Sequence, residues 1–274
     1  MLTIATPGVP KSTPSPGGTI EGIRHAHALG IRAMEMEWVQ RVPANPEHME
    51  AIGATARSLS FQLTVHAPYY INLNTPEADK LQASKRRILD ALTMAQLAGA
   101  VSVCVHAAFY LGGDPKDALE NVRRATDDIM QKKSQLFPHV NLAYETMGKP
   151  SQFGTMEEVL TISKEFGIYP CIDPAHLHAR ANGAVNTTEE WDAMLDQYVE
   201  YLGQDALRSM HLHYSGIAYG AKGEKHHVPL LESDARWKDF LQVLRMREVG
   251  GILVCESPLM EEDTLLLQNT FETL

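Results

Sequence analysis

Two metal-ligand side chains stand close together at the end of a long loop in the last third of the chain. Glu224 and His226 lie two residues apart, and a segment containing Gly216 and Gly220 separates them from His211. Imidazole and carboxylate groups are ligand types that zinc accepts. The loop is long enough to return over the strand that would carry His211, so this stretch predicts part of a metal site.

Six apolar segments of the sequence each end on a histidine or an acidic residue, which are also possible metal ligands. These residues are His66, His106, Glu145, Asp173, His211 and Glu256. A single His or Glu at a strand end is usually a capped or solvated residue. Six at the rim of one packed core would cost free energy unless they were paired or bound to metal. A shared metal centre is therefore the favoured interpretation.

Three further candidates lie just beyond strand ends, and they raise the set to nine residues. They are His176, Glu224 and His226. One zinc ion takes about four protein or water ligands. Nine candidates exceed that number and favour a cluster of two or three ions, with a carboxylate bridging between them.

The segments that must position these residues alternate between short apolar runs and longer amphipathic stretches. The expected strands are residues 2–5, 33–39, 62–66, 101–106, 140–145, 168–173, 207–211 and 251–256. The expected helices are residues 19–29, 47–58, 77–98, 114–133, 155–166, 188–202, 235–247 and 262–271. Eight continuous apolar strands alternating with helices predict a single-domain (β/α)8 TIM barrel, whose functional groups gather where the strands end. An open doubly wound sheet is the alternative, but the sequence contains no glycine-rich phosphate-binding motif to support it.

Composition limits the class of protein further. The length of 274 residues suits one α/β barrel, and the net charge of −10 argues against a broad polyanion-binding surface without excluding a locally positive cleft. Cys104, Cys171 and Cys255 all lie in apolar runs, which predicts free thiols in a reducing cytoplasm. The N-terminus has no secretory pattern, and the longest apolar stretch is too short to cross a bilayer. We expect a cytoplasmic monomer that has no membrane partner.

Five segments carry a more specific pattern. They read VHAPYYINL, VCVHAAFYLGG, LAYETMGK, CIDPAHLHARANG and the stretch from His211 to His226. Together they resemble the endonuclease IV family of apurinic/apyrimidinic endonucleases, and the similarity runs along essentially the whole chain. Members of that family are (β/α)8 barrels of the xylose isomerase-like superfamily with a trinuclear zinc site. The resemblance therefore implies up to three Zn²⁺ per chain, with Mn²⁺ or Fe²⁺ as alternatives at one or more sites.

By this resemblance the nine candidates divide into three sets, two of which share one carboxylate. The sets are His66, His106 and Glu145; Glu145, Asp173, His211 and Glu256; and His176, Glu224 and His226. Glu145 would bridge two ions. Glu224 stands where the family has Asp, so the loop must absorb one additional methylene group.

The resemblance implies hydrolysis of the DNA phosphodiester 5′ to an abasic site, as in base excision repair, with double-stranded DNA as partner. Clustered zinc would neutralise the phosphate and generate hydroxide near neutral pH. Glu145 would position the hydroxide, and Glu256 would accept the proton. Tyr69 would pack into the distorted duplex, while Arg41 and Lys225 would contact DNA. The competing interpretations are a rim tyrosine packed on its neighbour and two solvated cations.

A second function is open at this stage. Sugar isomerases and epimerases of the same superfamily hold one divalent ion through Glu, Asp, His and Glu on successive strands. Glu145, Asp173, His211 and Glu256 fit that pattern equally well. A mononuclear isomerase does not need His66 or His106, so the number of bound ions distinguishes the two functions. A non-catalytic metal-binding barrel is the third alternative.

Overall fold

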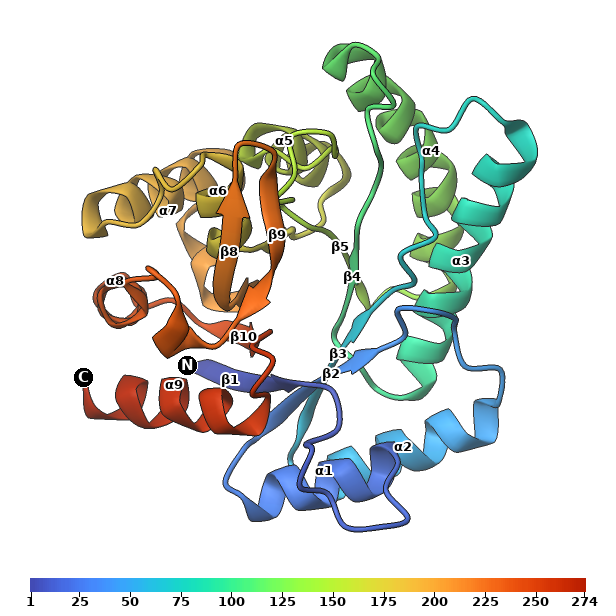
Figure 1. Cartoon of the computed structure of the whole chain (residues 1–274). Coiled ribbons are helices and arrows are strands. Elements are labelled where there is room, and N and C mark those ends of the chain that lie inside the picture. Colours follow the sequence, from blue (N-terminus) through green and yellow to red (C-terminus); the bar gives the residue numbers. More distant parts are fainter.

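The computed structural model confirms the predicted (β/α)8 barrel (Figure 1). It describes the backbone of residues 1–274 and every side chain except that of Ser134. The barrel strands are β1 (Leu2–Pro7), β2 (Ala33–Glu37), β3 (Gln62–His66), β4 (Ser102–Val105), β5 (Asn141–Tyr144), β6 (Cys171–Ile172), β7 (Met210–Tyr214) and β10 (Gly251–Cys255). The α-helices are α1 (Thr19–Ala28), α2 (Pro46–Ser58), α3 (Ala78–Leu97), α4 (Pro115–Leu136), α5 (Met156–Phe166), α6 (Pro174–Arg180), α7 (Thr188–Leu202), α8 (Trp237–Met246) and α9 (Glu261–Thr273).

All eight barrel strands run parallel, in the order β5-β4-β3-β2-β1-β10-β7-β6. The seam between β5 and β6 closes through a parallel bridge between Glu145 and Cys171, where the Thr146 N–H donates to the Cys171 carbonyl over 3.1 Å. Closure leaves the strands without free edges and brings all their carboxyl ends to one mouth.

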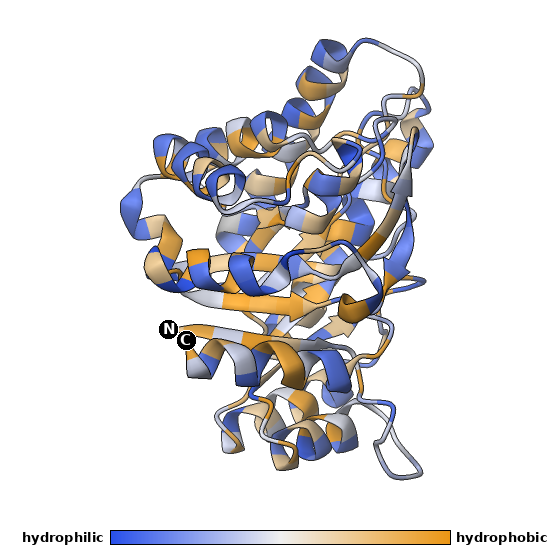
Figure 2. Ribbon diagram, turned by 60° about the vertical axis from the view of Figure 1, so that its left-hand side comes forward, coloured by the Kyte–Doolittle hydropathy of each residue, from blue (hydrophilic) through white to orange (hydrophobic). Residues whose placement is uncertain are grey.

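Apolar side chains cover both surfaces of the sheet. The helices turn their apolar sides toward the strands and their polar sides outward, and the strands themselves are mostly apolar (Figure 2). Inside the barrel, Ala5, Ala33, Ile252 and Val254 form one small apolar cluster, and Cys104, Ala143 and Cys171 form another. These small residues leave room in the barrel interior for larger polar side chains. No helix of the described chain combines the length and apolar character that a membrane span requires.

Local sequence signals account for several element ends. Thr155 and Glu158 form a reciprocal capping box at the start of α5, and Gly167 ends that helix in the left-handed conformation. Asp173 caps α6, a helix absent from the sequence-based prediction, by accepting the N–H of His176 over 2.9 Å.

Two elements differ from the prediction in ways that affect the site. The seventh strand is Met210–Tyr214 rather than residues 207–211, because Gln204–Ser209 form a 3₁₀ turn that buries Leu207. The segment expected to be a loop forms a hairpin of two antiparallel strands, β8 (Gly216–Gly220) and β9 (Gly223–Val228). This hairpin stands beside α6 (Figure 1).

Candidate metal centre

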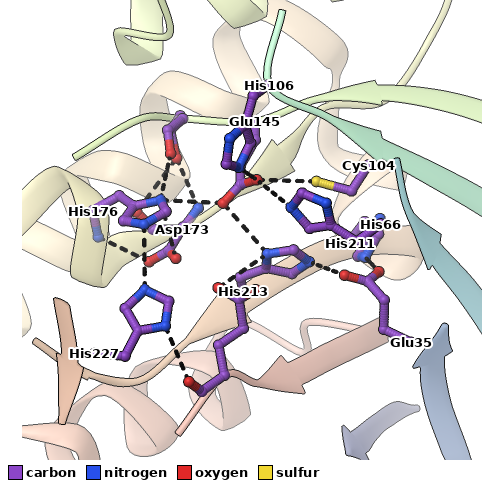
Figure 3. Close-up of polar contacts among 12 residues, drawn as sticks. Glu35, His66, Cys104, His106, Glu145, Asp173, His176, His211, His213 and His227 are labelled. Atoms are coloured by element: carbon purple, nitrogen blue, oxygen red, sulfur yellow. Dashed lines mark hydrogen bonds and ion pairs between the residues drawn. The ribbon is translucent and has the colours of Figure 1, made fainter. Parts of the chain in front are cut away.

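Histidine and carboxylate side chains from most of the barrel strands meet at the carboxyl end of the barrel (Figure 3). They come from the last residue of β3, from the residues directly after β4, β5, β6 and β10, and from α6, β7 and β9. In that order they are His66, His106, Glu145, Asp173, Glu256, His176, His213 and His227. Because parallel strands of a barrel end at one mouth, residues far apart in the sequence become neighbours here.

Glu145 lies at the middle of this cluster and is almost wholly buried. Its Oε2 lies 2.9 Å from Nε2 of His106 and 3.4 Å from Nε2 of His66. Its Oε1 lies 3.1 Å from Nδ1 of His176 and 3.4 Å from Nδ1 of His213. The two carboxylate oxygens therefore face two different pairs of imidazoles, which is the arrangement of a bridging ligand.

A second group of possible ligands includes His213, which faces Oε1 of Glu145. Ligand atoms of Glu145, Asp173, His213 and Glu256 all lie within 4.8 Å of one another. Nδ1 of His213 is 3.4 Å from Oε2 of Glu256. Three carboxylates and one imidazole at this separation match the oxygen and nitrogen ligands that zinc or manganese binds.

A third group joins α6 to the hairpin. Asp173, His176 and His227 bring ligand atoms within 4.8 Å of one another, and His176 Nε2 lies 3.6 Å from Oε2 of Glu224. The Glu224 N–H donates to the Gly148 carbonyl over 3.0 Å, which holds β9 against the loop after β5. A Cβ at Gly148 would lie 2.7 Å from Cβ of Glu224, so this close approach requires glycine.

The charges within the cluster balance one another. Burial alone would raise the pKa of Glu145, but the charges of His106 and His213 hold it well below its usual value. Burial likewise opposes ionisation of Glu256, yet the charge of His213 lowers its pKa to about 2. Burial alone would lower the pKa of His66, but its hydrogen bond to Glu145 prevails and raises the pKa to about 10. Glu145 and Glu256 are thus anionic, and the proton on His66 compensates part of their charge, whereas burial raises the pKa of Asp173 and lowers that of His106.

Several buried ligand atoms still lack hydrogen-bond partners within the described structure. They are Oε1 of Glu145, Oδ2 of Asp173 and both ring nitrogens of His213. A buried polar atom without a partner costs about 1–3 kcal/mol. Divalent cations bound by these atoms would remove that cost and replace the compensating protons, so the residues present fit a metal centre.

Comparison with known proteins agrees with this architecture. Residues 23–272 match the family described as xylose isomerase-like TIM barrel. The chain belongs to that family. Over its full length it is 33% identical to an uncharacterized protein of Methanocaldococcus jannaschii, of which it covers 98%. It is 26% identical to a probable endonuclease 4 of Oceanobacillus iheyensis over 68% of this chain, and 26% identical to the apurinic-apyrimidinic endonuclease of Caenorhabditis elegans over 77%.

Solved structures that share this fold have names that indicate more than one activity. The chain superposes on endonuclease IV from Thermus thermophilus with a TM-score of 0.75 at 20% identity, covering 99% of this chain and 98% of the other. It superposes on a D-tagatose 3-epimerase-like protein with a TM-score of 0.73 at 14% identity, covering 99% and 96%. The chain spans 60% and 56% of the two endonuclease relatives named above. The structural likeness establishes the fold.

Seven of the nine predicted ligand residues lie in or beside the cluster of this xylose isomerase-like barrel, and two do not. His211 lies deeper in the barrel, where its Nε2 is 3.0 Å from Oε2 of Glu35 and its Nδ1 is 3.1 Å from Oγ of Ser102. His226 is exposed on the hairpin. The residues at the cluster are instead His213 and His227.

Both differences have a physical cause. Because β7 extends to Tyr214, His211 and His213 both point into the barrel, and the later residue lies nearer the mouth. In the hairpin, Tyr219 pairs with Glu224 and Ala218 with His226, so Lys225 is an extra residue in a β-bulge. A bulge resets the alternation of side chains, and Glu224 therefore shares its side with His227 rather than His226.

The predicted substrate-contacting residues lie on the rim. Tyr69 has 49% of its surface exposed, stacks on His106 with ring centroids 5.2 Å apart, and meets His66 edge to face at 5.3 Å. Arg41 and Lys225 are exposed. Sequence reasoning also missed Glu35, which is wholly buried in β2. Its signal was the sequence AMEME, in which Glu35 is an acidic residue between two buried methionines.

Proposed function

We propose that the chain is a metal-dependent phosphodiesterase of the endonuclease IV type that cleaves DNA 5′ to abasic sites. The observation that supports a multinuclear centre best is the position of Glu145. One of its oxygens faces His66 and His106, while the other faces His176 and His213. The endonuclease relatives support DNA as the substrate.

Within this proposal each group of side chains holds one cation. The sets are His66, His106 and Glu145; Glu145, Asp173, His213 and Glu256; and Asp173, His176, Glu224 and His227. Zinc is the first candidate, and manganese or iron suit the same ligands. Bound cations would neutralise the phosphate and lower the pKa of water near it.

The chain's own residues supply orientation and proton transfer. Glu145 fixes the positions of four imidazoles, so the ligands are preorganised before substrate arrives. Glu256 is only partly buried and lies 3.4 Å from His213 at the mouth, so it would be the carboxylate that accepts a proton from the attacking water. Tyr69 offers an aromatic surface for a base or sugar, and Arg41 and Lys225 provide positive charge for phosphates.

A nicking assay tests this proposal. The purified chain, stripped of metal and then reloaded with Zn²⁺ or Mn²⁺, is incubated with a duplex carrying one tetrahydrofuran abasic analogue. We expect a metal-dependent cut 5′ to the analogue and no cut in the matched undamaged duplex. If the metal-loaded protein leaves both duplexes intact, abasic-site cleavage is not its function.

One observation favours a second function. Glu145, Asp173, His213 and Glu256 alone form a compact four-ligand group, which is sufficient for a single cation, and a D-tagatose 3-epimerase-like protein shares the fold. A mononuclear sugar epimerase would leave His66, His106 and His227 without a metal role. Metal content of one ion per chain, together with interconversion of ketose epimers, would establish that alternative.

A further inference from the structure

Below the metal centre a buried carboxylate lies between two histidines, on the side away from Glu145 (Figure 3). Glu35 is completely buried in β2. Its Oε2 is hydrogen-bonded to Nε2 of His211 over 3.0 Å, and its Oε1 lies 2.9 Å from Nε2 of His213. An ionised carboxylate at this depth costs free energy unless its partners compensate it, so the contacts with both rings are needed to keep it there.

The two nitrogens of His213 face opposite surroundings. Nδ1 faces the metal centre, 3.4 Å from Glu145 Oε1 and 3.4 Å from Glu256 Oε2. Nε2 lies 2.9 Å from Oε1 of Glu35, on the side away from Glu145 and Glu256. A neutral imidazole has one N–H and one lone pair, and the acceptor at one nitrogen decides which is which. A carboxylate at Nε2 keeps the proton there and leaves the Nδ1 lone pair directed at the cation.

His211, the second histidine bound to Glu35, is also fixed by its own contacts. His211 contacts Ser102 Oγ through Nδ1 at 3.1 Å, and its ring meets the ring of His213 edge to face with centroids 5.1 Å apart. Ser102, His211, Glu35 and His213 thus form a continuous row from the lower end of the barrel to the metal centre. Such a row restricts rotation of the His213 ring, which stands on β7 with its Nε2 at 2.9 Å from Oε1 of Glu35.

We propose that Glu35 is the positioning residue of the metal centre: it fixes the tautomer and orientation of His213 so that Nδ1 binds a cation. His211 supports Glu35 from behind rather than binding metal itself. This inference rests on the metal centre of the proposed function, but it does not depend on the substrate. It gives a role to Glu35 and His211, two buried polar residues that the cluster itself does not use.

Three substitutions of Glu35 separate positioning from direct ligation. In Glu35→Gln the amide oxygen accepts from His213, and the amide NH₂ donates to His211, whose other nitrogen then donates to Ser102. Glu35→Met removes both contacts at similar volume. Glu35→Asp keeps the charge but is one methylene too short to reach both rings. The matched control is Glu158→Gln, because Glu158 is a buried carboxylate bonded to Tyr110 outside the cluster.

The measurement is titration of the metal-free full-length variants with Co²⁺ and Zn²⁺, following the visible Co²⁺ absorption bands and the number and affinity of bound ions. We expect one cation to bind about 10- to 100-fold more weakly in Glu35→Met and Glu35→Asp. Glu35→Gln and Glu158→Gln should remain close to wild type in affinity and in Co²⁺ spectrum. Thermal unfolding monitors folding, and Glu35→Asp serves if Glu35→Met does not fold.

Three outcomes would overturn the inference, and a fourth would overturn only the proposed substrate. Unchanged affinity in Glu35→Met and Glu35→Asp would mean that Glu35 has only a structural role. An equal loss in Glu35→Gln would mean that Glu35 binds the cation directly. A wild-type chain that binds no cation would remove the metal centre as well as this inference. A chain that binds cations but does not nick DNA would overturn the proposed substrate and leave the role of Glu35 standing.

Discussion

The floor and the rim of the barrel mouth differ in how firmly the fold holds them. On the floor, Glu145 and its four imidazole neighbours make contacts of 2.9–3.4 Å within a mostly buried cluster. On the rim, Arg41 and Lys225 are exposed, and Tyr69 is half exposed. A rigid, dry site is what metal-assisted chemistry requires, whereas exposed side chains adapt to the shape of a substrate. The floor therefore determines the reaction class, and the rim determines the substrate.

Removal of the central carboxylate should have the largest effect. Glu145→Gln cannot serve as an anionic bridge between two imidazole pairs, so at least one cation should be lost. Charge stabilisation by a bound cation is worth several kcal/mol, and a loss of about 4 kcal/mol corresponds to about 1,000-fold in rate. Single-turnover nicking of the abasic duplex measures this loss. A variant with wild-type rate and metal content would show that Glu145 does not bridge cations.

The two adjacent histidines of β9, His226 and His227, test which residue of the hairpin belongs to the metal centre. His227→Asn removes a ligand that faces His176 across 3.5 Å, and we expect it to lower the metal content by about one ion per chain. His226→Asn is the matched control, because His226 is exposed on the other side of the hairpin. Elemental analysis of the metal content of both variants shows which of the two histidines binds a cation. Equal losses, or a loss confined to His226→Asn, would contradict the effect of the β-bulge at Lys225.

The sequence places most candidate ligands at the ends of apolar runs, and the structure places those residues at the mouth, because a parallel strand ends there wherever its apolar run ends. His66, His106, Glu145, Asp173 and Glu256 follow this rule. The rule failed for His211 because a 3₁₀ turn displaced β7, and an apolar Leu207 in that turn is indistinguishable from a strand residue by pattern alone.

The remaining differences depend on backbone detail that residue types do not encode. The spacing Glu-Lys-His suits ligands two residues apart only if the strand is regular, and a bulge at Lys225 made His227 the neighbour of Glu224 instead. Glu35 was missed because its partners, His211 and His213, come from β7, which does not pair with β2. Contacts across a barrel interior follow from closure and cannot be obtained from one strand's sequence.

A change on the rim should weaken substrate binding without altering the metal. Tyr69→Ala removes an exposed ring, and stacking of one base on an aromatic side chain contributes about 1–3 kcal/mol. We expect KM for the abasic duplex to rise about 10-fold with unchanged metal content. Tyr70→Ala is the control, because Tyr70 is more exposed and does not contact the cluster histidines. An effect on metal content in Tyr69→Ala would place Tyr69 on the floor instead.

The smallest effect concerns a carboxylate far from the cations. Glu261 accepts the N–H of Lys11 over 3.0 Å and that of Ser12 over 2.8 Å. Burial opposes its ionisation, but these backbone hydrogen bonds prevail and lower its pKa. Because the folded-state pKa is depressed, the stabilisation is present above the unfolded pKa of about 4.3 and is lost as the pH falls through the folded value.

Glu261→Gln should therefore lower the free energy of unfolding by about 1 kcal/mol at neutral pH, and the difference from wild type should shrink in acid. Urea unfolding at several pH values measures it, with the exposed neighbour Glu262→Gln as control. A difference that is independent of pH would show that the Glu261 charge does not contribute to stability. Metal content should be unchanged in both variants, in contrast to every substitution on the floor.

The number of cations per chain tests the central claim most directly. The purified wild-type protein is loaded with Zn²⁺, freed of excess metal and measured by elemental analysis against protein concentration. Two imidazole pairs around one bridging carboxylate, with a third group on α6 and β9, predict two or three ions per chain. A single ion per chain would contradict the multinuclear site and favour an epimerase with one metal held by Glu145, Asp173, His213 and Glu256.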